Sequence, residues 1–346
     1  SVEYSDKFPW PIGADALGAG DRWTGIDPMR HQYRGISLER VNGGAPGDAP
    51  ANWLAAPLAT GPSPARPNAT VLLKPLPVVE SLTTTGSVGG LIRATDEVRI
   101  RVKFSDGNIP SIVWLEYFIE DIDSTDEEKT QEKMKRNGEH FIVALPPHPD
   151  RTIVRYRILA NRGNGVEVVS PRTHDPLHWY GYFVTPHYES SKPAYEMFIS
   201  RESKKFLSRN IVANPVGGFT PKLGATPKGG WNETAPAVLV YEGVVRDIET
   251  RNQGSFWGRS GAIRSNKIRF PRYNQLNGQR ALLMTSKDDK TMAGHFLFVE
   301  AGFPGPRTRW VDFWVNGRRS KRLEIEAHDQ WLLERYRDER AELYPD

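Results

Sequence analysis

The chain of 346 residues contains no cysteine. Disulfide bonds, Cys-ligated metal sites and thiol nucleophiles are therefore excluded. It also has no apolar run of about 18 residues, so we expect no membrane span. A G-x-S-x-G motif is missing as well, and with it the nucleophile elbow of many hydrolases. What remains is an ordinary globular balance, with 38% hydrophobic and 25% charged residues.

Metal-binding patterns are weak in this sequence. Among the eight histidines, His174 and His178 are four residues apart, but Pro176 between them excludes a helix, so no zinc site is expected. The alternating acids of residues 121–128 resemble a calcium loop but lack its glycine and its distal bidentate Glu. We interpret this segment as a solvated charged loop and assign no metal ligand.

Three segments differ in composition, which agrees with two or three domains for a chain of this length. Residues 1–66 are rich in Gly, Pro, Ala and Trp and end in a Pro/Ala/Gly run typical of a linker. Residues 71–187 contain several short alternating stretches, and residues 193–346 mix helical and strand patterns. The chain begins at Ser1 without a signal peptide and ends at Asp346 within a helical pattern. We interpret both ends as cuts in a longer polypeptide.

The middle segment is predicted to be a β-sandwich. Val98–Val102 and Thr152–Ala160 alternate apolar and charged residues with the period of a half-buried strand. Ile112–Ile119 and Phe141–Leu145 are further strands, and turn residues separate all four. We expect three aromatic side chains to be largely buried in this module, namely those of Trp114, Tyr156 and Trp179.

The third segment is predicted to be an α+β domain. Residues 201–208 and 290–301 have helical composition, and Gly302 stands where a left-handed helix cap is needed. Asn316-Gly317 after the strand Thr308–Val315 predicts a hairpin. Further strands are expected at residues 195–199, 237–241 and 267–270. A last helix is expected from about residue 329 to 343.

Positive charge is concentrated between Val244 and Lys287. Nine Lys and Arg residues stand there against only Asp247 and Glu249, although the net charge of the chain is just +4. Such a stretch is either a solvated strand face or a site for an anion such as phosphate. Nucleic acid is not expected as a partner, because no recognised nucleic-acid motif accompanies the charges.

Two groups of residues resemble known structural modules. Tyr4, Pro9-Trp10-Pro11, Ser37-Leu-Glu-Arg40 and Ala51-Asn-Trp53 resemble the last strands of bacterial lamin-tail domains, although the insertion Trp23–Arg34 departs from the usual spacing. Leu145-Pro-Pro147, Val154-Arg-Tyr156 and Trp179-Tyr-Gly-Tyr-Phe-Val184 are similar to a fibronectin-like module. The first resemblance covers only the later part of a lamin-tail domain and implies a poorly covered apolar face near Trp10 and Trp53.

The third segment resembles CotH-type atypical kinases. The residues that carry this resemblance are Arg246-Asp247, Arg251-Asn-Gln-Gly254, Gly258, Gly261, Lys267-Ile-Arg-Phe270, Phe298-Val-Glu-Ala-Gly302, Pro304, Pro306-Arg-Thr308 and Val315-Asn-Gly317. The implied fold is two β-sandwich (Ig-like) modules followed by the N-terminal part of a kinase-like α+β domain. The whole chain is then multidomain and mainly β.

The resemblance implies a site for ATP with Mg²⁺ or Mn²⁺. Lys267 would hold phosphates, Arg251 would be a second cation, and Gly254 and Gly258 would let backbone amides approach phosphate oxygens. The Lys267 ammonium is then expected to point into a concave surface that the Gly254–Gly261 loop covers. The helical acid that kinases pair with this lysine is in doubt, because Thr291 stands at the corresponding spacing.

The implied function is phosphoryl transfer to Ser or Thr of surface or secreted proteins, by a kinase that is itself secreted or on the cell surface. The catalytic and metal-holding acids are expected beyond Asp346, so no catalytic residue is assigned. Glu324 and Glu326 could lie near an adenine-binding hinge, but their alternation with Leu323 and Ile325 is what any edge strand shows. The alternative is a non-catalytic extracellular protein of adhesion or assembly.

Overall fold

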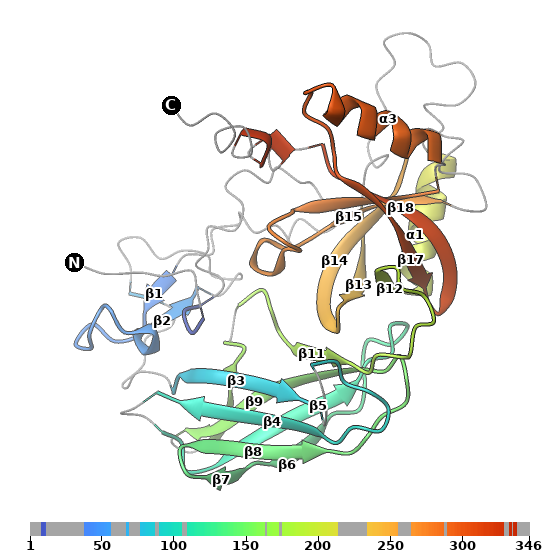
Figure 1. Ribbon diagram of the computed structural model, residues 1–346. Helices are drawn as coiled ribbons and strands as arrows, with labels where there is room; N and C mark the ends of the chain where they lie inside the picture. Colours follow the sequence, from blue (N-terminus) through green and yellow to red (C-terminus); the bar gives the residue numbers. More distant parts are fainter. Residues whose placement is uncertain are drawn as a thin grey trace. The chain divides into compact units, whose positions relative to one another are not determined.

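The structure is a computed structural model of a mainly β protein (Figure 1). It describes residues 8–11, 38–56, 67–68, 77–86, 90–105, 109–162, 165–172, 175–213, 234–254, 264–286, 289–328, 332–333 and 335–337. The chain divides into two compact units, Ser1–His187 and Tyr188–Asp346. Each unit is described below by itself. In the described residues, no helix is long and apolar enough to cross a membrane.

Most strands of the first unit form two antiparallel sheets. One sheet has the order β3 (Val79–Thr85), β4 (Val98–Phe104), β8 (His140–Leu145) and β7 (Lys135–Asn137). In the other, β9 (Ile153–Arg162) pairs on one side with β5 (Val113–Ile119), which in turn pairs with β6 (Thr130–Lys133). Strands β10 (Gly165–Ser170) and β11 (Tyr180–Phe183) also pair with β9.

Alternate residues of the two sheets share one core. Ile100, Val102 and Phe104 of β4 pack with Leu115 and Ile158 of the other sheet, as the alternation in the sequence predicted. The strand predictions over 98–102, 112–119, 141–145 and 152–160 are therefore confirmed.

The expected burial of the three aromatics is only partly correct. Tyr156 is 4% exposed, but Trp114 and Trp179 are half-buried. Trp114 lies between the core residues Val113 and Leu115, so it points to the opposite face of its sheet. Trp179 is half-buried because it packs edge-on against Phe118 and lies under the Arg157 guanidinium, away from the core.

The described residues of the N-terminal part of this unit include one short hairpin. Strands β1 (Leu38–Arg40) and β2 (Trp53–Ala55) form a short hairpin, and the 3₁₀ turn η3 (Pro50–Asn52) precedes β2. Asn52 is fully buried, and its amide nitrogen donates to the carbonyl oxygens of Asn42, Ala45 and Pro46. These bonds fold the connecting loop around one side chain, because the loop has few apolar residues of its own.

Arg172 connects this hairpin region to the rest of the unit. Its guanidinium donates to the carbonyl oxygens of Pro9, Pro50 and Trp53, at 2.6, 2.6 and 2.8 Å. Burial lowers the pKa of Arg172 to about 10, and the nearby Asp175 opposes that effect. The cation therefore replaces its lost hydration with three backbone carbonyls.

The second unit is built on a closed barrel of seven strands. Its strands are β12 (Ala194–Phe198), β13 (Ala235–Tyr241), β14 (Val244–Gln253), β15 (Ser265–Arg269), β16 (Ala281–Thr285), β17 (Thr308–Val315) and β18 (Arg318–Glu326). Antiparallel pairs join β12 to β13, β13 to β14, β14 to β15, β15 to β16, β16 to β18 and β18 to β17. The parallel pair of β12 with β17 closes the ring.

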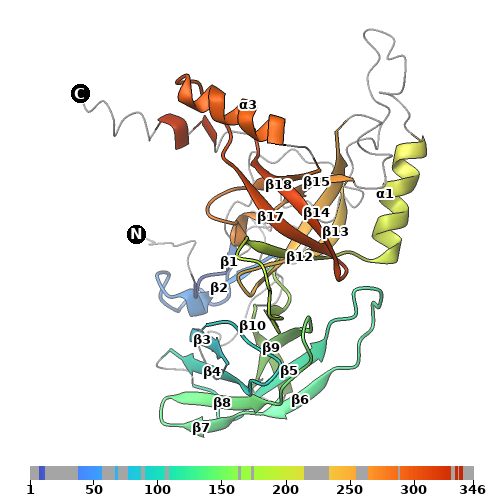
Figure 2. The ribbon, with the colours of Figure 1, turned by 45° about the vertical axis from the view of Figure 1, so that its right-hand side comes forward.

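The apolar residues of six strands meet inside the barrel. Met197, Leu239, Ile268, Met284 and Phe313 belong to one buried cluster. Because a closed barrel has a single interior, these residues and their in-register neighbours point inward, and the alternate residues point outward. Helix α1 (Arg201–Ala213) adds Leu207 to this core, whereas α3 (Asp289–Glu300) contacts β17 and has no buried residue. Figure 2 shows both helices.

Several predicted elements of this unit are confirmed. Helix α3 ends at Glu300, and Gly302 just beyond it has a φ of 81°, which provides the left-handed cap. Asn316 and Gly317, with φ of 47° and 78°, form the two-residue turn between β17 and β18. The Asn316 side chain also accepts from the Ile199 amide and donates to its carbonyl, at 2.9 Å each. Of the last predicted helix, only residues 332–333 and 335–337 are described, and these are helical.

Replacing Arg172 by Met tests its role as the link to the N-terminal hairpin. Arg172→Met keeps the aliphatic stem but leaves three carbonyls without their donor. We expect the free energy of unfolding to fall by about 2–4 kcal/mol. Denaturant unfolding measures this change. Arg99→Met is the matched control, because Arg99 is exposed and pairs only with the exposed Glu97. A loss equal to that of the control would contradict the proposed role of Arg172.

Candidate functional site

The predicted phosphate-binding residues lie together on the outer surface of the barrel. Lys267 of β15 is directly opposite Arg251 of β14, and on its other side it is opposite Leu283 of β16. Because Ile268, the next residue of β15, is fully buried in the barrel core, Lys267 points outward. We call the pair Arg251 and Lys267 the outer cation pair.

Helix α3 begins on the same face of the sheet. Lys267 is opposite Leu283 of β16, Leu283 is opposite Ile325 of β18, and Ile325 is opposite Thr308 of β17, so all four side chains lie on the same face. Trp310, two residues further along β17, is on this face too, and its indole N–H donates to Asp289 at the first turn of α3 (3.1 Å). The outer cation pair and the start of α3 therefore both lie on the outer surface of the barrel.

Arg251 is a desolvated cation beside other cations. Burial lowers its pKa to about 10, and the charge of Arg269 lowers it further. Its guanidinium donates to the carbonyl oxygen of Asn252 at 3.3 Å. No carboxylate pairs with it among the residues that the structure describes. Three cations, Arg251, Lys267 and Arg269, stand together on this face with one acid, Glu249, directly opposite Arg269. The face therefore carries an excess of positive charge, which suits a phosphate or carboxylate group.

Gly254 follows β14 immediately and has a φ of 105°, which is unfavourable for residues with a side chain. It is three residues from Arg251, so its backbone is close to the outer cation pair in the chain. Gly258 and the rest of the loop 255–263 lie outside the described residues, as does the expected cover of Lys267 by that loop.

The helical acid expected near Lys267 is not identified by the structure. Asp289 accepts the bond from Trp310, and Glu300 is exposed at the far end of α3. Thr291, at the spacing where the resemblance expects an acid, lies in the first turns of α3. In the described ranges, no group of three or more metal-binding side chains is found.

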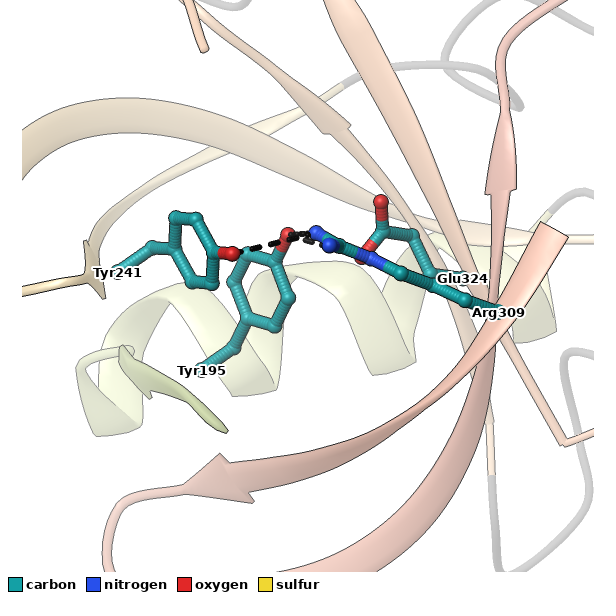
Figure 3. A network of polar contacts seen from close by, with 4 residues as sticks. All are labelled: Tyr195, Tyr241, Arg309 and Glu324. Carbon is teal, nitrogen blue, oxygen red and sulfur yellow. Dashed lines mark hydrogen bonds and ion pairs between the residues drawn. The ribbon is translucent and has the colours of Figure 1, made fainter. Parts of the chain in front are cut away.

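A second polar cluster, which the sequence did not predict, lies inside the barrel (Figure 3). The rings of Tyr195 and Tyr241 stack with centroids 4.3 Å apart. The Tyr195 hydroxyl donates to Glu324 at 2.8 Å, and the same carboxylate oxygen accepts from Arg309 at 2.9 Å. Arg309 also donates to the hydroxyls of Tyr195 (2.9 Å) and Tyr241 (3.4 Å).

Burial sets the charge states in this cluster. It raises the pKa of Tyr195, and the Glu324 carboxylate raises it further. For Arg309 burial acts to lower the pKa, but hydrogen bonding and attraction to Glu324 outweigh it, so the pKa is raised. The two phenols therefore stay neutral, while Arg309 stays charged. This is a satisfied network that joins β12, β13, β17 and β18, and its role is structural.

The expectation that Glu324 and Glu326 belong to an edge strand is wrong. Strand β18 pairs on both sides, with β16 and with β17, and both carboxylates are nearly buried. Glu324 pairs with Arg309 inside the barrel, and Glu326 pairs with Arg335 at 2.7 Å. Alternation of charged and apolar residues looks the same in an edge strand and in a strand whose inner face is polar.

Comparison with known protein families, with curated proteins and with solved structures gives no match for this chain.

Glu324→Gln tests the interior network. The amide keeps the shape of the side chain but removes the negative charge that balances Arg309. We expect a loss of about 1–2 kcal/mol in the free energy of unfolding of the second unit, because the partly exposed Arg309 loses its counter-charge and the buried Tyr195 hydroxyl loses a charged acceptor. Denaturant unfolding measures the loss. Glu300→Gln, at an exposed position, should change stability by less than about 0.5 kcal/mol.

A double-mutant cycle with Arg309→Met makes this test specific. If the two side chains act as one pair, their effects should not add. Additive losses would mean that the carboxylate stabilises the barrel without Arg309, against the structural role given to the network.

Proposed function

We propose that residues 193–346 are the nucleotide-binding portion of a CotH-like atypical protein kinase. In this proposal the substrates are Ser or Thr hydroxyls of surface or secreted proteins, and the protein is secreted or at the cell surface. One observation carries the proposal: the outer cation pair lies next to Gly254, on the face of the sheet where α3 begins.

The residues present suit the phosphates of ATP. Arg251 is a cation without a described carboxylate, and Lys267 stands directly opposite it. A guanidinium offers paired donors to phosphate oxygens, whereas an ammonium acts as a compact point charge. Bound ATP supplies the phosphoryl group, and Mg²⁺ or Mn²⁺ neutralises its developing charge. Arg251 and Lys267 would hold the phosphate oxygens, and Gly254 would leave the backbone accessible beside them.

The first unit is proposed to position this domain. We interpret residues 71–187 as a fibronectin/Ig-like β-sandwich, which is supported by two sheets with a shared core. Residues 1–66 are interpreted as the later part of a lamin-tail-like domain. Arg172, which connects the two regions through backbone carbonyls, supports their acting as one unit.

Nucleotide binding to the full 346-residue chain tests the proposal. Titration with a fluorescent ATP analogue and Mg²⁺ should give saturable binding, and ATP should raise the unfolding midpoint. Lys267→Ala should weaken binding about tenfold, because a charge-assisted contact to phosphate is lost. Arg251→Ala should weaken it to a similar extent.

Arg280→Ala is the control for this experiment. Arg280 belongs to the same basic stretch, but its side chain is exposed and does not belong to the outer cation pair. The Arg280→Ala variant should bind nucleotide with the same affinity as the unchanged chain. Equal affinities of the Lys267, Arg251 and Arg280 variants would mean that the basic stretch is a solvated face without a role in nucleotide binding. The support for a kinase would then be lost.

The second candidate function is adhesion or assembly without catalysis. The observation that favours it is the apolar surface of α3 and its C-terminal turn, where five large side chains are about half exposed: Phe296, Leu297, Phe298, Val299 and Phe303. Clustered exposed apolar side chains are typical of protein contact surfaces. A chain that binds no nucleotide but associates with rising concentration, and loses this on Phe296→Ser, would favour this function.

A further inference from the structure

The short strands β6 and β7 lie at the edges of two different sheets of the first unit. Strand β6 pairs only with β5, and β7 only with β8, among the residues that the structure describes. Met134 between them is 3% exposed, and its amide donates to the carbonyl of Val113. The chain therefore passes from one sheet edge to the other, and Met134 fills the opening of the core there.

A hollow of about 410 Å³ lies at this crossing, and we call it the β6–β7 hollow. Its apolar lining comes from Ile112, Met134 and Phe141, and its polar lining from Ser111, Lys133, Lys135 and Arg136. Arg136 lies over the Phe141 ring, 5.9 Å from its centroid. The hollow thus combines an apolar floor with a cationic rim.

The three rim cations have no acidic partner in the part of the chain that the structure describes. All three are exposed, and Arg136 donates only to the carbonyl of Gly138. Lysines on a free edge also discourage copies of a protein from pairing their sheets. Protection of the sheet edge does not require the cations to surround a hollow. A cationic rim around an apolar floor is instead typical of a binding site.

We propose that the β6–β7 hollow binds an extended acidic peptide segment of a partner protein. Carboxylates of the peptide would contact Lys133, Lys135 and Arg136, and an apolar side chain between them would occupy the floor. The peptide backbone would pair with the free edge of β7. The spacing supports this, because alternate side chains of an extended strand point to one side and deliver every second residue to the hollow.

The free edge favours a peptide over other anions. Only a polypeptide offers both the carboxylates for the rim and the backbone groups that an unpaired strand edge accepts. A phosphate polymer satisfies the rim alone. A peptide and a phosphate polymer can therefore be distinguished by testing whether binding requires the backbone amides of the ligand.

Fluorescence anisotropy with a labelled octapeptide of the repeat Glu-Ser-Val-Ser, which places Glu and Val in turn on the same side of an extended strand, tests this site on the full chain. We expect saturable binding that weakens as salt is raised. The double variant Lys135→Gln/Arg136→Gln should bind about tenfold more weakly, since two charge contacts are lost. Lys129→Gln, in the same charged segment but outside the hollow, should bind like the unchanged chain.

Two further ligands complete the test. The same octapeptide with N-methylated amides on alternate residues should fail to bind, because it cannot pair with the edge of β7. Inorganic polyphosphate of equal charge should bind at least about tenfold more weakly than the peptide. Equal binding of the double variant, of the methylated peptide or of polyphosphate would each overturn the proposal. Circular dichroism melting confirms that the variants are folded, and none of these outcomes depends on nucleotide binding by the second unit.

Discussion

Closure of the seven-strand barrel is the constraint on which the second unit depends. The parallel pair of β12 with β17 is the only one of the seven pairings that is not antiparallel, and it brings together strands far apart in the chain. Once the ring is closed, every strand residue must point either inward or outward, and a shift of one residue would exchange the two sets. The closure therefore decides which cations are enclosed and which remain on the wall.

The charges of the cations inside the barrel and on its outer surface are balanced differently. Arg309 is neutralised by Glu324 and held by two neutral phenols, so its charge is balanced within the fold. Arg251 is desolvated as well, but its cross-strand partner is the cation Lys267, and beside this pair Arg269 stands directly opposite Glu249. The first arrangement balances its charge within the fold, whereas the second leaves three cations to one acid on the wall, an excess of positive charge that suits an anionic ligand.

Local structure was largely predictable from the sequence, but the arrangement of the strands was not. The alternation in 98–102 and 152–160, the helix cap at Gly302 and the Asn316-Gly317 turn depend on neighbouring residues, and all were predicted correctly. Barrel closure depends on pairing between distant strands, for which a single sequence gives no local signal. The inner polar cluster was missed for the same reason, since Tyr195 and Arg309 are 114 residues apart. Lys267 and Arg251 were both selected from the sequence as candidate phosphate-binding cations, but only the register shows that they stand directly opposite each other on the outer wall.

The turn that ends β17 makes the barrel sensitive to chemical ageing. Asn followed by Gly is the dipeptide in which the side-chain amide is lost most readily, through a cyclic imide formed with the next backbone nitrogen. Asn316 uses that amide to donate to the carbonyl of Ile199, just before α1. Deamidation replaces the donor with a second acidic oxygen, which would repel that carbonyl. Stored protein would thus accumulate a more acidic form in which the chain between β12 and α1 is less firmly held, without any change in the encoded sequence.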